Sequence, residues 1–260
     1  MVKKSDLKKL NSIMQEGNEL KNEKQFNGAV EKYLEALKFV EDKVKDPIEK
    51  EDELSNIKSQ IDQIYSVEII DIIEKAKDFV MDNKFDEAYN TFDEALRIAD
   101  KIMDKDMRDY DVNQVNYLID EAKLKQLTYQ ATLLRNEEEF DKAIKILNEA
   151  LNSAEIIHKD DPNHETIKLI QKNINETYSL EVHKYLNKAN QLKAENNYND
   201  AIDVYKDALE LTNKYFESEM KTNEIMNLQN LINQLMSIQI KPIVEKGKSY
   251  FDEGNFTDAV

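Results

Sequence analysis

The sequence FNGAVEKYLEAL at residues 26–37 spaces its apolar side chains three and four positions apart, at Phe26, Ala29, Tyr33, Ala36 and Leu37. Steps of three and four place side chains on one face of an α-helix. The alanines let a second helix approach closely, and the aromatic rings fill the space beside them. This stretch therefore predicts a helix that packs against a partner helix along one face.

The same pattern returns as FDEAYNTFDEAL at 85–96, FDKAIKILNEAL at 140–151 and YNDAIDVYKDAL at 198–209, and it starts again as FTDAV at 256–260. Successive copies begin 59, 55, 58 and 58 residues apart. The residue after each leading aromatic is of a type that can cap a helix N-terminus: Asn27, Asp86, Asp141, Asn199 and Thr257. We expect a repeated helix, called helix B, to begin at these caps.

A second apolar stripe precedes each copy of helix B and carries a small residue at its centre. The small residues are Gly17, Ala76, Ala131, Ala189 and Gly247. Two helix backbones can approach closely at such a residue, and a short polar turn follows each stripe. The pattern predicts a helix A that pairs with helix B as an antiparallel hairpin.

Helix A is expected to be long, because its apolar stripe extends upstream without Gly or Pro. Long helices are predicted to start near Pro47, near Asp109 and near Pro162, with Asp46 and Asp161 as caps before first-turn prolines. They should run unbroken through 61–72 and 174–185. Pro242 should kink or break the last of them.

The hairpin pattern resembles the tetratricopeptide repeat family, which has a small residue in helix A, an aromatic before helix B, and Ala, aromatic and Ala along helix B. The best match is carried by Gly17, Asn18, Leu20, Phe26, Ala29, Tyr33 and Ala36. The family repeats about every 34 residues. This chain repeats near 58 and lacks the family's usual Trp in A and Pro after B.

The resemblance implies an all-α fold, an α-solenoid of antiparallel helical hairpins with elongated A helices, over residues 1–260. The hairpins are predicted at about 5–44, 47–105, 109–158 and 162–216, with a truncated fifth from 222 to 260. Its last long helix should then leave Ile243, Tyr250 and Phe251 uncovered. An alternative is a string of three-helix modules similar to microtubule-interacting-and-trafficking domains, which would need a turn within 61–72.

Composition excludes several classes. Four Gly and three Pro in 260 residues are too few for the turns of an all-β or βαβ fold, and the absence of Cys excludes disulfides and thiolate metal sites. The net charge of −17 disfavours nucleic acid and anionic membranes as partners. With no membrane-length apolar run and no leader-like start, we expect a cytoplasmic protein without membrane insertion.

No catalytic, metal-binding or cofactor-binding residue is predicted. His158, His164, Asp160 and Asp161 cluster in one connection, but a structural role in starting a helix explains them better than a metal site. No nucleophile can be paired with a base. We expect a protein that is not an enzyme, although a regulatory arm of a larger enzyme that continues beyond residue 260 is an alternative.

The polar face of helix A is the candidate binding site, since the resemblance implies that this face lines a peptide groove. The candidate residues are Asn18, Lys21, Asn22, Lys77, Thr132, Arg135, Asn136, Asn187, Asn190 and Lys193. Met14 stands where some relatives carry a carboxylate-binding Lys. The sequence thus predicts a protein–protein interaction scaffold or adaptor for basic or neutral peptide segments of other proteins.

Overall fold

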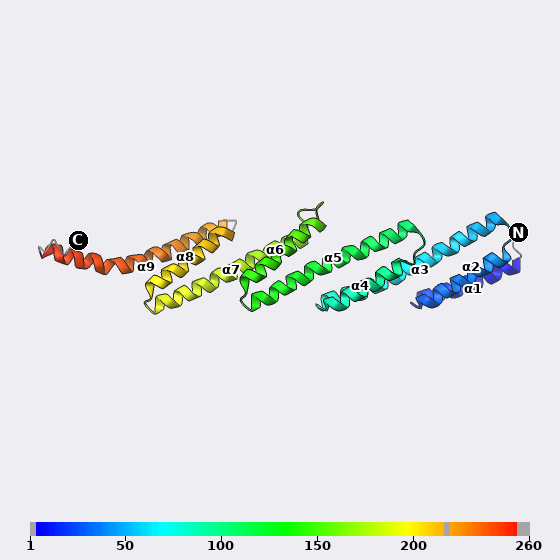
Figure 1. Cartoon of the computed structure of the whole chain (residues 1–260), viewed down its shortest axis with the longest axis horizontal. Coiled ribbons are helices and arrows are strands. Elements are labelled where there is room, and N and C mark those ends of the chain that lie inside the picture. The colour runs from blue at the N-terminus through cyan, green and yellow to red at the C-terminus, as the bar shows by residue number, and fades with distance from the viewer. Residues whose placement is uncertain (1–3, 216–218, 254–260) are drawn as a thin grey trace. The chain divides into compact units, whose positions relative to one another are not determined.

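The computed structural model describes residues 4–215 and 219–253, which contain nine α-helices and no strand (Figure 1). The helices are α1 (Lys4–Asn22), α2 (Phe26–Lys43), α3 (Pro47–Met81), α4 (Phe85–Ala99), α5 (Lys105–Asn136), α6 (Phe140–Ile157), α7 (Glu165–Ala194), α8 (Tyr198–Tyr215) and α9 (Glu219–Asp252). The all-α prediction is confirmed for these residues. The helix pairs alternate as predicted, with a long A helix before each short B helix from α3 onward.

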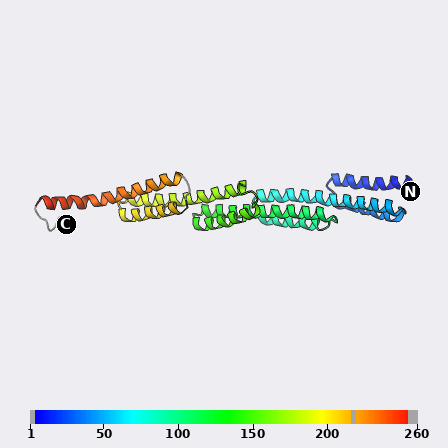
Figure 2. The ribbon, with the colours of Figure 1, turned by 90° about the horizontal axis from the view of Figure 1, so that it is seen from above.

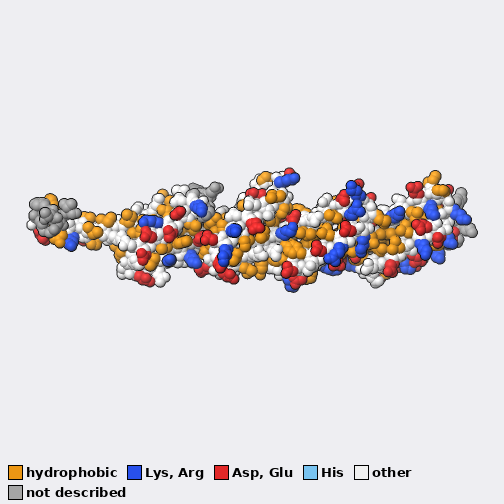
Figure 3. Space-filling view, in the orientation of Figure 1, with side chains coloured by type: hydrophobic (Ala, Val, Ile, Leu, Met, Phe, Trp, Pro, Cys, Tyr) orange, Lys and Arg blue, Asp and Glu red, His pale blue; other side chains and the backbone are white. Residues whose placement is uncertain are grey.

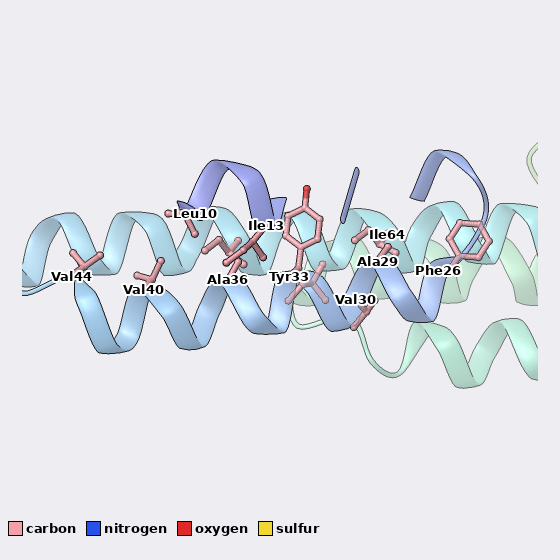
Figure 4. Close-up of a cluster of buried hydrophobic side chains, with 12 residues drawn as sticks. Leu10, Ile13, Phe26, Ala29, Val30, Tyr33, Ala36, Val40, Val44 and Ile64 are labelled. Atoms are coloured by element: carbon pink, nitrogen blue, oxygen red, sulfur yellow. The ribbon is translucent and has the colours of Figure 1, made fainter. Parts of the chain in front are cut away.

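The chain divides into two compact units, Met1–Gln126 and Leu127–Val260, and the division falls inside α5. In the first unit, a core cluster joins α1, α2 and the first half of α3 through residues such as Ile13, Tyr33 and Ile64 (Figure 4). α2 packs against both α1 and α3, and Figure 2 shows the blue α1 beside the first hairpin's second helix. Each hairpin is thus covered by the first half of the next long helix, which the two-helix pattern did not predict.

The second half of α3 belongs to a different core, which it forms with α4 and the first part of α5. Ile64 lies in the first core and Ile69 in the second, and α3 continues between them without a turn. In the second unit, α7 packs against α6 and α8 and likewise runs unbroken through 174–185. Both predictions of unbroken helices are confirmed, and the turn that tandem three-helix modules need within 61–72 is absent from α3.

Close approach of the paired helices depends on the small residues of helix A. A Cβ added at Gly17 would lie 2.7 Å from Cε2 of Tyr33, a side chain that is almost fully buried. Ala76 and Ala189 occupy the equivalent positions opposite Phe92 and Tyr205 and are fully buried. The small-residue stripe therefore sets the spacing of the hairpins, as the sequence predicts.

The predicted caps of helix B are wrong. Each B helix begins at the aromatic itself, so Asn27, Asp86, Asp141 and Asn199 lie inside the first turn. Thr257 is outside the described residues. The reason is that a residue with positive φ lies two positions after the end of each helix A, and helix B begins two positions after that residue. The residues with positive φ in these turns are Lys24, Asn83, Glu138 and Asn196.

These turns share one hydrogen-bond pattern. The N–H of Gln25 donates to the carbonyl of Leu20 at 2.9 Å, and that of Lys24 donates to Lys21 at 3.0 Å, which is the pattern of a Schellman motif. The equivalent pairs recur after α3, α5 and α7. Because this motif satisfies the last carbonyls of helix A, the chain reverses without Gly.

The starts of α3 and α7 and the course of α9 match the predictions to different degrees. α3 starts at Pro47, and Asp46 accepts from two backbone N–H groups, as predicted. α7 starts at Glu165 with His164 as its cap, so the cap assignment of Asp161 is wrong: Asp161 accepts from Asn163 in the preceding turn. α9 continues through Pro242, so the helix is not broken there, although Figure 1 shows its ribbon changing direction toward the C-terminal end.

α5 begins at Lys105, four residues before the predicted start, with Asp104 as its local cap, and a distant side chain holds the two residues that precede the helix. The buried carboxylate of Asp62 on α3 accepts from the N–H groups of Met103 and Asp104 at 2.8 and 2.9 Å. Both donors precede Lys105, so Asp62 anchors the residues that lead into α5 and does not cap its first turn. This contact fastens the start of α5 to the middle of α3.

Candidate peptide-binding groove

Two adjoining hollows lie in the second unit, where the turn between α5 and α6 faces the middle of α7. The first, called the amide groove, has a volume of about 550 Å³ and is lined by Arg135, Asn136, Glu138, Phe140, Leu180, His183, Lys184 and Asn187. The second, called the Glu181 pocket, has a volume of about 500 Å³ and is lined by Glu138, Glu139, Phe140, Asp141, Lys142, Glu181, Lys184, Tyr185 and Lys188. Three residues line both hollows, which makes them parts of one depression.

The amide groove contains three of the predicted site residues. Arg135 and Asn136 come from the end of α5, and Asn187 comes from α7. Arg135 is held in place by Glu176, whose Oε2 lies 3.7 Å from Nη1. The structure therefore brings together, around one hollow, side chains that are 51 residues apart in the sequence.

The other predicted residues of this unit have different surroundings. Asn190 accepts a hydrogen bond from the hydroxyl of the buried Tyr205 at 2.6 Å, which gives it a packing role. Thr132 donates to the carbonyl of Thr128 in its own helix at 2.9 Å. Lys193 is half-buried near the end of α7 and does not line the amide groove.

In the first unit, Asn18, Lys21 and Asn22 lie near the end of α1, and Lys77 lies on α3. Asn18 occupies the position equivalent to Asn190, opposite Tyr33. The Tyr33 hydroxyl is buried without the well-formed hydrogen bond of Tyr205. Burial raises the pKa of Tyr33, and the nearby Asn18 side chain opposes this rise. In both of these hairpins, a buried tyrosine hydroxyl on helix B therefore has an asparagine at the facing position of helix A.

Ion pairs between largely exposed side chains line the depression. Lys184 Nζ lies 2.7 Å from Glu138 Oε2 and 5.6 Å from the centre of the Phe140 ring. Lys142 Nζ lies 2.5 Å from Glu139 Oε2. Lys24 and Asp71 form the equivalent pair in the first unit, with the positive and negative residues exchanged. In both units the pair joins the positive-φ residue of a turn to the next long helix.

Glu181 is a functional candidate that the sequence pattern did not predict. Its side chain is only 8% exposed, and its Oε2 is buried without a hydrogen-bond partner. Burial raises the pKa of this carboxyl, the negative charge of Asp141 raises it further, and Lys184 opposes both. In the sequence, Glu181 lies three residues after Tyr178 and four before Tyr185, which places a charged residue within the apolar stripe of the helix. That position is the sequence signal that could have identified Glu181 as a candidate.

Replacing Glu181 with Gln should raise the melting temperature at neutral pH. Because the folded state raises the pKa of Glu181, ionisation of this carboxyl opposes folding above that pKa. The penalty vanishes below the pKa of an unfolded glutamate, about 4.3. Melting curves at neutral pH and below that value should show a gain for Glu181→Gln only at neutral pH. An equal gain at both would assign the effect to packing instead.

The three histidines make local contacts, and His183 also lines the amide groove. The rings of His158 and His164 stack with centroids 3.5 Å apart, and Nδ1 of His164 accepts from the N–H of Thr166. Nδ1–H of His183 donates to the carbonyl of Ser179 at 2.7 Å.

Among the described residues, no three His, Cys, Asp or Glu side chains are grouped so that they could hold a metal ion. Within the same residues, no helix has the long apolar stretch that a bilayer crossing requires.

No protein-family model matches this chain, and no curated protein matches it. The tetratricopeptide resemblance thus rests on the hairpin motifs alone. Function is therefore inferred from the residues of the depression.

Proposed function

We propose that this protein is a non-catalytic interaction scaffold that holds an extended peptide segment of another protein in the amide groove. The observation that carries the proposal is the convergence of Arg135, Asn136 and Asn187 on one hollow. Amide side chains both donate and accept hydrogen bonds, as a peptide backbone requires. Leu180, which is 47% exposed, adds an apolar contact for a partner side chain.

Charge supports a basic or neutral partner. The chain carries 53 acidic and 36 basic residues, and Figure 3 shows the two signs intermixed on the face that it displays. A net negative protein attracts basic segments and speeds their association at low salt. The proposal extends to the fold: the hairpins are elongated relatives of the tetratricopeptide hairpin, arranged as a solenoid.

The test begins with a displayed library of random 12-residue peptides, selected for binding to the full chain. The best peptide is then titrated against the variant Arg135→Ala/Asn136→Ala/Asn187→Ala. Loss of three polar contacts should weaken binding at least tenfold, since about 1.4 kcal/mol corresponds to a factor of ten. The exposed Asn136 and Asn187 should each alter stability by within about 0.5 kcal/mol. Arg135, whose side chain is 20% exposed, also loses its pair with Glu176, so the melting temperature of the variant is measured beside its affinity.

The matched control replaces Asn22 and Lys77, which belong to the predicted face in the first unit, with Ala. These changes should leave the affinity unchanged. Asn190 is kept in all variants because it hydrogen-bonds Tyr205. Unchanged affinity in the triple variant, or loss of binding in the control, would show that the peptide lies elsewhere.

A further inference from the structure

The Glu181 pocket contains a carboxylate that its own protein leaves incompletely satisfied. Glu181 is more than nine-tenths buried, and its Oε2 accepts no hydrogen bond. A buried ionised group is costly unless a partner compensates it. Glu181 lines the pocket together with Asp141 of α6. A ligand entering this pocket would therefore meet two carboxylates.

The lysines around the pocket are mostly engaged elsewhere. Lys184 pairs with Glu138 and Lys142 pairs with Glu139. The remaining charged groups of the lining are Glu181, Asp141 and Lys188, so the negative charge exceeds the positive charge by one. The pocket is therefore electrostatically suited to one added cation.

The shape of the added cation follows from the rings of the lining. Phe140 and Tyr185 both line the pocket, but Phe140 is only 8% exposed and has Lys184 Nζ 5.6 Å from its ring centre, so the half-buried Tyr185 is the ring that a ligand can stack on. A guanidinium is planar, stacks on aromatic rings and pairs with carboxylates through a fork of N–H donors. An ammonium is a compact, strongly hydrated charge that gains less from such surroundings.

We propose that the Glu181 pocket binds an arginine side chain of the peptide held in the amide groove, with its guanidinium paired to the carboxylates of Glu181 and Asp141. The proposal rests on the proposed function and specifies the partner more closely. Glu138, Phe140 and Lys184 line both hollows, so one extended chain can reach from one to the other. Glu181 is then the residue that selects the partner's basic side chain.

Binding should depend on pH through Glu181. The groups around it are Asp141, Glu138, Glu139 and Lys142 from α6 and its preceding turn, and Lys184, Tyr185 and Lys188 from α7. Burial and Asp141 raise the pKa of Glu181 in the free protein. A bound guanidinium favours the ionised carboxylate, so affinity should fall as the pH drops through that raised pKa.

The experiment titrates the full chain, labelled with ¹⁵N, with acetyl-Ala-Ala-Arg-Ala-Ala-amide and with its citrulline counterpart, which has the same shape without the charge. The arginine peptide should bind at least tenfold more tightly. Glu181→Gln should abolish this preference. The matched control Glu210→Gln removes one exposed negative charge from α8 of the same unit and should retain it.

Equal binding of the two peptides, no binding of the arginine peptide, or an arginine preference that survives in Glu181→Gln would overturn the inference. If Glu181→Gln fails to fold, the pH profile of the arginine preference is measured in the unaltered protein, and a preference independent of pH overturns the inference. If the arginine preference is absent but library-selected peptides still require Arg135, Asn136 and Asn187 for binding, the proposed function stands. If those peptides bind equally well without the three side chains, the proposed function is rejected.

Discussion

Replacing Asp62 with Ala is expected to lower the free energy of unfolding of the first unit by about 3 kcal/mol. The carboxylate is 2% exposed, and its two oxygens accept separately from the N–H groups of Met103 and Asp104. Its removal leaves both donors without their acceptor at the start of α5. Hydrogen bonds to charged groups contribute about 1.5–3 kcal/mol each.

Asp104 provides the matched control, because it is an exposed and purely local cap. Its Oδ1 accepts from the N–H of Met107 at 2.9 Å. Removing an ordinary cap costs about 1 kcal/mol. Urea denaturation followed by circular dichroism should therefore rank Asp62→Ala well below Asp104→Ala in stability. If the two variants are equally stable, the Asp62 contact does not fasten α5 to α3.

Replacing Val67 with Pro is expected to destabilise the first unit by about 3 kcal/mol or more. Val67 is 41% exposed and lies in α3 between Ile64 and Ile69, which belong to different cores. Proline removes a helical N–H and clashes with the preceding turn. Because α3 is one helix that serves both cores, a break at residue 67 should weaken both.

The control Val67→Ala removes the same exposed side chain and keeps the helix, so it should change stability by within about 0.5 kcal/mol. Amide hydrogen exchange can show where Val67→Pro acts. Protection should fall on both sides of residue 67, in the α2 and the α4 contacts of α3. A loss of protection confined to one side would indicate that the two cores are independent modules joined by a linker.

The sequence predicts the helices well because the steps of three and four between apolar residues report directly which face of a helix is buried. It predicts their ends less well. Helix B starts at its aromatic because Lys24, Asn83, Glu138 and Asn196 adopt positive φ, which none of these residue types requires. The residues that lead into α5 are held by Asp62, about 40 residues upstream, and no local pattern encodes such a contact.

The candidate site was predicted in part. Arg135, Asn136 and Asn187 could be assigned because the hairpin pattern shows which side of helix A faces away from helix B. Asn190 has the same residue type and a nearby position, but its partner Tyr205 becomes evident only from the packing of α7 and α8. Glu181 was missed because the burial of its carboxylate depends on how α6 packs against α7. The residues around Glu181 in the sequence do not reveal that packing.

Photo-crosslinking tests most directly where the peptide lies. Benzoylphenylalanine is placed at residue 183 in the amide groove or, in a separate protein, at residue 77 in the first unit, and each is irradiated with a library-selected peptide. We expect an adduct with the peptide from position 183 and none from position 77. An adduct from position 77 with none from position 183 would rule out the amide groove as the binding site.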